Sequence, residues 1–307
     1  MNICVVGAGA IGGWVAARLA LAGNSVMALT SRGPLDTTDL NEGGVSQVAE
    51  LTRFDGPADV LIVAVKATAL APAAQFARAF VGPGTAIVPM LNGVPWWFVD
   101  GMQLRSIDPD GSVAAALPFE QIVGCVVHAS SSRAGSTVVV KHAEKLIIGE
   151  PQGGETSERV ARLFAVLDEA GLRPDLTGNV RRAIWYKLWG NATINPLSAL
   201  VRASCDRILA DPECRAWMLE GMAELAAIGA AVGCPISESG EDRMAVTARL
   251  GAFKTSMLQD VEAGRPIELE ALLGAPREIA RAHGIETPAL DRLYGVTKLM
   301  AESLELA

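Results

Sequence analysis

The sequence predicts an α/β domain with a mostly parallel sheet over residues 1–177, followed by an all-helical domain over residues 178–307. The chain of 307 residues is about twice as long as a typical domain, and half of its residues are apolar. Short β-branched runs alternate with helical stretches in the first part, and such runs stop near Gly178. This order of elements is typical of a doubly wound sheet with a separate helical domain.

Four apolar runs predict parallel strands that are buried on both faces, because such strands are apolar almost throughout. The expected strands are Asn2–Val6, Ser25–Leu29, Asp59–Val65 and Thr85–Pro89, with helices over Ile11–Ala22 and Ala67–Phe80. Later runs at Ile122–Ser130, Thr137–Lys141 and Lys145–Ile148 predict a hairpin that turns at Gly135, and Glu155–Ala170 predicts a helix that ends at Gly171.

Proline-containing breaks divide the second part into long amphipathic helices. The breaks stand at Asp211-Pro212, Cys234-Pro235, Arg265-Pro266 and Thr287-Pro288. A cleft between an α/β domain and a helical domain is a common place for a ligand. We therefore expect the functional site between the two predicted domains.

Composition excludes several classes of function. A net charge of −8 without long charge runs argues against nucleic-acid binding. No apolar stretch reaches the roughly 18 residues of a membrane span, and the first residues predict a strand rather than a signal peptide. Three histidines at unrelated spacings predict no metal site, and five scattered cysteines indicate reduced thiols in a cytoplasmic protein.

A glycine-rich loop follows the first expected strand and opens the first expected helix. It reads Gly7-Ala8-Gly9-Ala10-Ile11-Gly12 and has the GxGxxG spacing. We expect Gly7 to permit a tight turn, Gly9 to let a diphosphate approach the backbone, and Gly12 to let the helix pack closely. The loop therefore predicts a Rossmann-type dinucleotide site, with a ligand-free glycine turn as the alternative.

The end of the second strand indicates which dinucleotide is bound. NAD enzymes usually have an acidic residue there for the ribose hydroxyl groups, whereas this chain has Ser31 and Arg32. A guanidinium group can bind a 2′-phosphate, so the sequence favours NADPH over NADH. Asp36 lies a few residues further on and could instead bind the ribose hydroxyl groups of NADH, so NADH remains an alternative.

Two polar residues follow the next strands, where ligands of parallel sheets bind. Lys66 ends the strand Asp59–Val65, and Asn92 follows the strand Thr85–Pro89. Both are candidate ligand-binding residues, although a solvated lysine and a turn asparagine before Gly93 are equally consistent with the pattern.

The expected helix Val180–Leu200 carries three polar residues in one line. Lys187, Asn191 and Asn195 are spaced by four residues, and the rest of this helix is largely apolar. Buried polar groups need partners, so the line suggests a polar ligand; a wet helix edge is the alternative. A lysine ammonium can stabilise and protonate a carbonyl oxygen during hydride addition. Glu268 stands near another helix start, where acids are common for dipole reasons alone.

These motifs together resemble the ketopantoate reductases (2-dehydropantoate 2-reductases) over essentially the whole chain. The resemblance rests on the glycine loop, Val65-Lys66-Ala67, Asn92-Gly93, Trp185-x-Lys187-Leu188-x-x-Asn191-x-x-x-Asn195-Pro196-Leu197, and Ser256-Met257-Leu258-Gln259-Asp260 followed by Glu268. It implies an NADPH-dependent reduction of a small 2-keto acid to (R)-pantoate in pantothenate synthesis, by a homodimer.

The resemblance also implies roles for the site residues. Lys187 would be the general acid, and Glu268 would contact the reacting centre and the cofactor. The substrate would be held by Asn92, Asn191, Asn195 and Ser256, and Lys66 and Asn92 would bind the cofactor.

Two departures from the family pattern leave the identity of the substrate undecided. Pro95-Trp96-Trp97 replaces a glycine and an acidic helix start, and Cys205 lies where the family often has an asparagine. The aromatic residues could line the site or belong to the core. Alternatives are therefore a related reductase of another 2-keto acid or an imine, and a non-catalytic NADPH-binding sensor.

Overall fold

The computed structural model describes residues 1–249 and 251–306, and the chain divides into two compact units. The first contains Met1–Leu91 and Gly111–Ala183, and the second contains Asn92–Asp110 and the chain from Ile184 onward. The domain boundary between residues 177 and 178 remains a prediction. The place of Asn92–Asp110 in the second unit has no counterpart in the sequence pattern.

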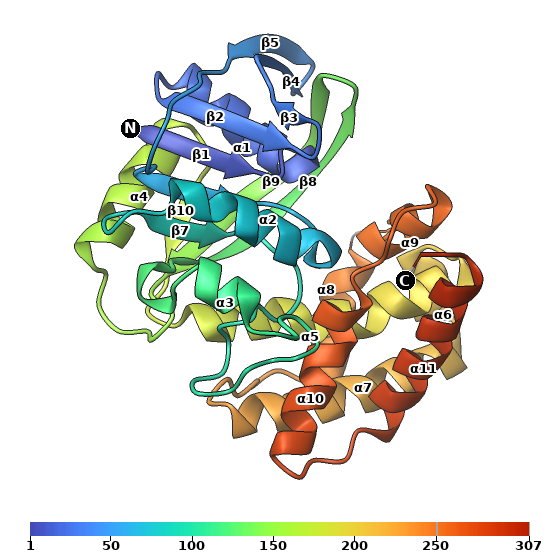
Figure 1. The fold of residues 1–307 in the computed structure, drawn as a ribbon. Helices are drawn as coiled ribbons and strands as arrows, with labels where there is room; N and C mark the ends of the chain where they lie inside the picture. Colours follow the sequence, from blue (N-terminus) through green and yellow to red (C-terminus); the bar gives the residue numbers. More distant parts are fainter. Residues whose placement is uncertain (250, 307) are drawn as a thin grey trace. The chain divides into compact units, whose positions relative to one another are not determined.

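A five-stranded sheet with the order β3-β2-β1-β6-β7 lies in the first unit (Figure 1). Its strands are β1 (Asn2–Val6), β2 (Ser25–Thr30), β3 (Gly33–Pro34), β6 (Val60–Val63) and β7 (Ala86–Pro89). All are parallel except the short β3, which pairs antiparallel with β2. The four predicted strands and the mostly parallel, Rossmann-type sheet are therefore confirmed, and their apolar runs are buried as parallel strands require.

A second sheet of the first unit has the order β10-β9-β4-β5, and β8 pairs with β9. Its strands are β4 (Thr37–Glu42), β5 (Val45–Glu50), β8 (Gly124–Ala134), β9 (Thr137–Gly149) and β10 (Pro174–Leu176). The predicted hairpin at Gly135 is confirmed, and β9 unites two runs that were predicted as separate strands. No sequence signal predicted β4 and β5, because β4 is mostly polar and β5 is mostly exposed, so neither has the continuous apolar run of a buried strand.

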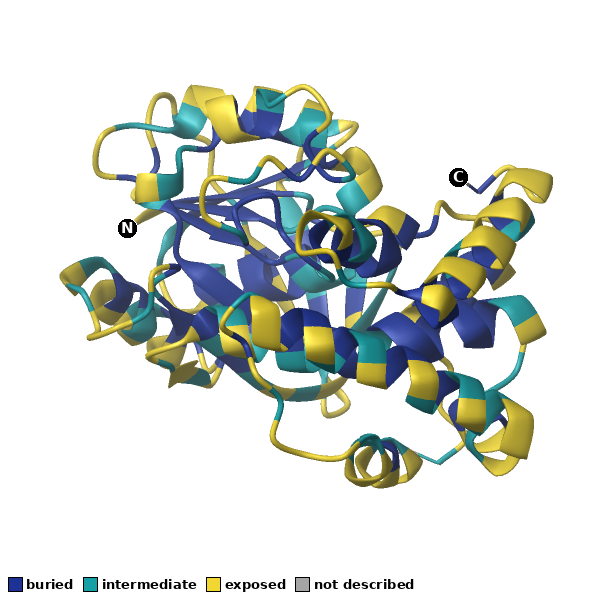
Figure 2. Ribbon diagram, turned by 90° about the horizontal axis from the view of Figure 1, so that it is seen from below, coloured by how far each residue is buried: buried dark blue, intermediate teal, exposed yellow. Residues whose placement is uncertain are grey.

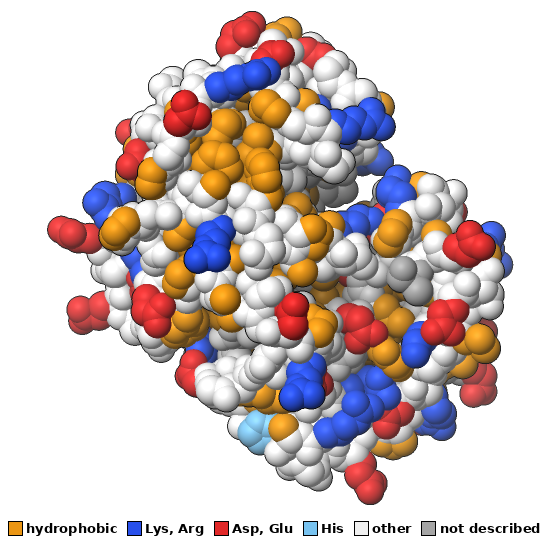
Figure 3. Space-filling view, viewed as in Figure 1, with side chains coloured by type: hydrophobic (Ala, Val, Ile, Leu, Met, Phe, Trp, Pro, Cys, Tyr) orange, Lys and Arg blue, Asp and Glu red, His pale blue; other side chains and the backbone are white. Residues whose placement is uncertain are grey.

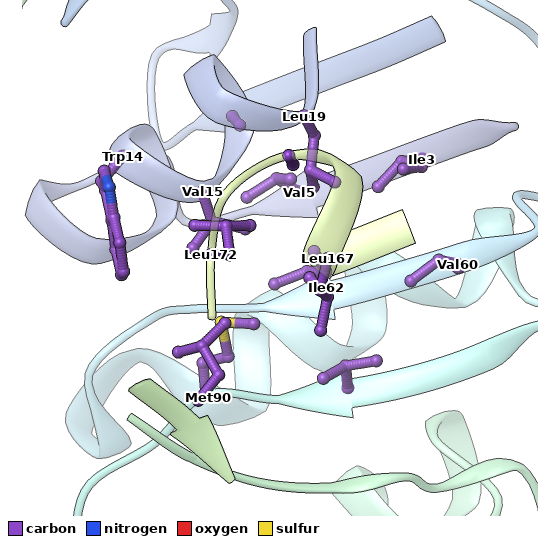
Figure 4. Packing of buried hydrophobic residues seen from close by; sticks show 14 of the residues in the cluster. Ile3, Val5, Trp14, Val15, Leu19, Val60, Ile62, Met90, Leu167 and Leu172 are labelled. Carbon is purple, nitrogen blue, oxygen red and sulfur yellow. The ribbon is translucent and has the colours of Figure 1, made fainter. Parts of the chain in front are cut away.

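The helices of the first unit cover and separate the two sheets. They are α1 (Ala10–Leu21), α2 (Leu70–Ala77) between the short turns η1 (Ala67–Ala69) and η2 (Arg78–Phe80), α3 (Ser112–Ala116), η3 (Phe119–Gln121) and α4 (Glu158–Glu169). Helix α1 contacts strands of both sheets. Val15 and Leu19 of α1 pack with Val5 and Ile62 of the parallel sheet, and Leu167 of α4 belongs to the same core (Figure 4).

From Ile184 onward, the regular elements of the second unit are all helices over the described residues, as predicted. The segment Asn92–Asp110 of this unit forms turns and loops. The helices of the second unit are α5 (Val180–Val201), which begins in the first unit, α6 (Cys205–Ala210), α7 (Pro212–Ala231), α8 (Gly240–Ala248), α9 (Ser256–Glu262), the π-helix η4 (Glu270–Gly274), α10 (Ala275–Ala282) and α11 (Pro288–Ser303). The breaks predicted at Pro212 and Pro288 are confirmed as the first residues of α7 and α11. A proline fits the first turn because the N–H group that it lacks has no helical partner there.

Burial follows the two sheets and the inward sides of the helices (Figure 2). On the face shown in Figure 3, basic and acidic side chains are interspersed. Among the described residues, no helix combines the length and the apolar character that a membrane span needs.

Candidate active site

The glycine-rich loop joins β1 to α1 and is tied to the end of β2. The N–H groups of Gly7 and Ala8 both donate to the carbonyl oxygen of Leu29 at 2.9 Å. Gly7 has a φ of +95°, and a Cβ there would lie 2.8 Å from the backbone carbonyl of Ala64. Only glycine therefore fits this turn, as predicted from the motif.

Gly9 and Gly12 differ in what surrounds them. A Cβ at Gly12 would lie 2.2 Å from the carbonyl oxygen of Gly7, so this glycine lets α1 approach the loop. A Cβ at Gly9 would meet nothing closer than that same oxygen at 4.0 Å, and Gly9 is exposed. The space beside Gly9 is thus open to a ligand.

This loop fits the diphosphate of a dinucleotide. The N–H groups of Ala10, Ile11 and Gly12 lie in the first turn of α1, where an α-helix offers them no acceptor. The first turn contains no acidic residue. Open space, orphan donors and the positive end of the helix dipole together suit an anionic group.

The predicted ribose-binding residues lie in a tight turn between β2 and β3. Ser31 and Arg32 are both exposed, and the N–H group of Arg32 donates to Thr30 Oγ1 at 3.2 Å. The carboxylate of Asp36, the residue that kept NADH open, accepts a hydrogen bond from Arg53 at 2.7 Å. This ion pair is exposed to solvent and leaves Asp36 accessible.

Lys66 lies directly after the residues that the glycine loop touches. Strand β6 ends at Val63, three residues before Lys66, and a Cβ at Gly7 would meet Ala64 and Val65. The lysine is half-buried and precedes η1. Its place at the carboxyl end of a parallel strand, next to the loop, agrees with the prediction.

In the second unit, a hydrogen-bonded chain links three of the predicted residues. Lys187 Nζ donates to Asn92 Oδ1 at 3.0 Å, and Asn92 Nδ2 donates to Glu268 Oε2 at 3.4 Å. Glu268 is 8% exposed, whereas Lys187 and Asn92 are half-buried. Because Asn92 Nδ2 donates to a carboxylate oxygen of Glu268, the amide oxygen of Asn92 is turned toward the Lys187 ammonium.

Two tryptophans fix the rotation of α5. Trp185 Nε1 donates to the carbonyl of Leu225 at 3.0 Å, and Trp189 Nε1 donates to the carbonyl of Met222 at 2.8 Å. Both acceptors belong to α7, so this side of α5 faces α7. Two residues correspond to about 200° on a helix, so Lys187 lies on the opposite side.

The other predicted substrate residues lie along α5 and at the start of α9. Asn191 is half-buried and Asn195 is 6% exposed, one and two turns after Lys187. Ser256 is the exposed first residue of α9. The preceding residue, Thr255, hydrogen-bonds through its hydroxyl to Ser198 of α5, which anchors the start of α9 beside this end of α5.

A close backbone contact holds Asn92 near Glu268. The N–H group of Val94 donates to the carbonyl of Ala271 at 2.9 Å, and Ala271 lies in η4, three residues after Glu268. Gly93 has a φ of +80°, and a Cβ there would lie 2.3 Å from the same carbonyl oxygen. Functional sites often contain such π-turns, which interrupt the regular helical ladder.

Replacing Gly93 by alanine is expected to weaken both folding and substrate binding. The left-handed backbone alone costs ~1–2 kcal/mol for an alanine, and the clash with Ala271 adds to this cost. Displacement of Asn92 is expected to raise KM for a keto acid about tenfold or more. Thermal unfolding and steady-state kinetics measure the two effects.

Gly101 offers a matched control in the same unit. Its φ is +69°, yet a Cβ there would meet nothing within 4 Å. The G101A variant should therefore show the cost of the backbone conformation without the clash. Equal stability and equal KM for G93A and G101A would contradict the importance of the Ala271 contact.

The aromatic residues that depart from the family pattern are packed into the second unit. Trp96, Trp97 and Phe98 are at most 6% exposed, and Phe98 stacks on Trp185 with ring centroids 5.5 Å apart. Of the two interpretations, the structure supports the one in which they belong to the core. Cys205, the other departure, is buried at the start of α6.

One residue near the glycine loop has no counterpart in the sequence prediction. Arg133 of β8 donates through Nη1 to the carbonyl of Ala8 at 2.5 Å. The two residues are 125 positions apart. The only local hint is Gly13, which follows the three glycines of the motif and contacts this arginine.

Pyridine-nucleotide-dependent oxidoreductases combine a glycine-rich dinucleotide loop with catalytic side chains that are held in place by the protein. The chain belongs to this class of enzymes. Residues 3–153 match the family model described as ketopantoate reductase PanE/ApbA, and residues 179–301 match the model of its C-terminal part. The chain is a member of the ketopantoate reductase family.

Individual relatives agree with this assignment. A 2-dehydropantoate 2-reductase of Mesorhizobium japonicum is 34% identical over 98% of both chains. A crystal structure from Ralstonia solanacearum MolK2, described provisionally as a ketopantoate reductase, is 44% identical, with a TM-score of 0.94 over 100% of this chain and 99% of its own. A D-mandelate dehydrogenase solved with NADH and anilino(oxo)acetate shares the fold, with a TM-score of 0.85 over 100% of both chains at 20% identity.

Proposed function

We propose that this protein reduces 2-dehydropantoate (ketopantoate) to (R)-pantoate with NADPH, for pantothenate synthesis, and that Lys187 is the general acid. The observation that carries the proposal is the hydrogen-bonded chain of Lys187, Asn92 and Glu268. It holds an ammonium group in one orientation beside two polar residues of the same helix. Family membership supports the choice of substrate.

The residues of the second unit would act on the keto acid. Lys187 donates a proton to the carbonyl oxygen as negative charge develops there. Asn92 orients the ammonium, and Glu268 fixes the amide of Asn92. Asn191, Asn195 and Ser256 offer amide and hydroxyl groups for the substrate carboxylate and hydroxyl; this assignment rests on the family resemblance.

The residues of the first unit would hold the cofactor, which supplies the hydride when bound. The loop from Gly7 to Gly12 would bind the diphosphate, with Lys66 nearby; Asn92 and Glu268 of the second unit are proposed as further cofactor contacts. Arg32 and Ser31 would bind the 2′-phosphate, which favours NADPH.

Two further properties complete the proposal. Each of the five cysteines, all within the described residues, is a free thiol, which suits the reducing cytoplasm. The family resemblance implies a homodimer, and sedimentation velocity of the purified protein measures this directly.

A panel of substrates tests the proposed reaction. We expect loss of NADPH absorbance with ketopantoate, at a higher kcat/KM than with 2-keto acids that lack its hydroxyl group. Turnover of another keto acid or an imine, without turnover of ketopantoate, would identify a related reductase instead. Tight NADPH binding without any turnover would identify a sensor.

A further inference from the structure

The side chain of Arg133 extends from β8 to the buried carbonyl of Ala8 in the glycine loop. Its Nη1 donates to the carbonyl of Ala8 at 2.5 Å, and its Nε donates to the carbonyl of Gly135 at 3.0 Å. Ala8 is 2% exposed and Arg133 is half-buried. Two hydrogen bonds from different nitrogens fix the plane of the guanidinium group against the loop.

Gly13 makes room for this arginine. A Cβ at Gly13 would lie 2.9 Å from Arg133 Nη1 and 2.9 Å from Val138 Cγ2. Gly7, Gly9 and Gly12 already account for the turn, the ligand space and the helix packing. The absence of a side chain at Gly13 therefore leaves the space that Arg133 of β8 occupies beside the loop.

The contact with Ala8 also constrains the next residue of the loop. The carbonyl of Ala8 and the N–H group of Gly9 belong to one planar peptide and point in opposite directions. The N–H group of Gly9 donates to the carbonyl of Gly7 at 2.7 Å, so Gly7 and Arg133 hold the two sides of this peptide. The contact with Arg133 keeps the partial negative charge of the Ala8 carbonyl turned into the protein. A carbonyl turned the other way would repel an anion beside Gly9.

The guanidinium also adds positive charge at this end of α1. Burial lowers the pKa of Arg133, and the negative charge of Asp39 raises it. A guanidinium group nevertheless remains protonated at neutral pH. Its charge lies at the carbonyl of Ala8, two residues before the start of α1, and adds to the positive end of the helix dipole.

We propose that Arg133 is a positioning residue for the diphosphate of the dinucleotide, because it orients the Ala8–Gly9 peptide and places positive charge beneath the cradle. This inference rests on the proposed function, since it requires a dinucleotide at the glycine loop. It predicts that Arg133 acts equally on NADPH and NADH, which share the diphosphate. Arg32, by contrast, should act on NADPH alone.

Titrations of the full chain with each dinucleotide test this inference. Isothermal titration calorimetry gives Kd for NADPH and for NADH with the wild type, R133Q and R32Q, and thermal unfolding gives Tm. For R133Q we expect Kd to rise about tenfold for both dinucleotides, as for a lost charge-assisted contact. For R32Q we expect a similar rise for NADPH and little change for NADH.

The variants distinguish the outcomes. A lower Tm for R133Q with unchanged Kd values would show a purely structural arginine, and an effect on NADPH alone would assign it to the 2′-phosphate; either result overturns the proposal. If R133Q does not fold, R133K, which keeps the charge but loses the planar fork, should still weaken both dinucleotides by the same factor. A wild type that binds neither dinucleotide would instead overturn the proposed function.

Discussion

Replacing Lys187 by alanine is expected to lower kcat about 100-fold or more, while NADPH still binds. The loss follows from removing the proton donor and the positive charge that stabilises the developing oxyanion. The N–H groups of the glycine loop, which would hold the diphosphate, belong to the first unit, whereas Lys187 belongs to the second. Pre-steady-state measurement of the hydride-transfer step, together with Kd for NADPH, separates the two effects.

Two other substitutions sharpen this test. K187R keeps the charge, but a guanidinium is a poor proton donor, so its kcat should also remain low. Lys298 of α11 offers a surface control, because its ion pair with Glu302 is exposed, and K298A should behave like the wild type. A kcat for K187A within a few-fold of the wild type would remove Lys187 from the role of general acid.

The substitutions G9A and G12A are expected to affect different properties of the protein. G9A should fold normally, because its Cβ meets nothing closer than 4.0 Å, yet the methyl group would occupy the space for a diphosphate. Its Kd for NADPH should rise by about 100-fold or more, since both phosphates would be displaced from the N–H groups. G12A should lose both stability and NADPH binding, because its Cβ would lie 2.2 Å from a backbone oxygen.

Tm and Kd for NADPH measure the difference between the two variants. Gly84 provides a control glycine in the same unit, because it is exposed and a Cβ there would meet nothing within 4 Å. G84A should leave both quantities within error of the wild type. Normal NADPH affinity for G9A would contradict binding of the diphosphate at this loop.

Local patterns made the parallel sheet and the glycine cradle predictable. Buried parallel strands are apolar on both faces, so their runs are visible without any knowledge of partners. The three glycines of the loop lie within six residues; Gly7 and Gly12 meet steric demands that the motif encodes, and Gly9 leaves open space. The line from Lys187 to Asn195 was likewise visible, because helical spacing is a local property.

The unpredicted features depend on contacts between distant residues. Strands β4 and β5 bury Thr38, Leu40 and Ala49, which do not form a continuous apolar run in the sequence. Nothing near Asn92 in the sequence indicates that Gly93 and Val94 pack on Ala271, because Ala271 lies in η4, almost 180 residues later in the chain. Arg133 is equally invisible, because an arginine near a hairpin turn is ordinarily a solvated charge.

The segment Asn92–Asp110 has a consequence for the order in which the chain folds. Its contacts with Lys187 and Glu268 span 95 and 176 residues, so synthesis of the segment precedes that of its partners by a long interval. Trp96, Trp97 and Phe98 remain without their native burial until α5 and η4 have left the ribosome. Long-range contacts of this kind form slowly, and exposed aromatic residues favour aggregation meanwhile. The aromatic residues of this segment are therefore synthesised well before α5, whose Trp185 stacks on Phe98 in the folded unit.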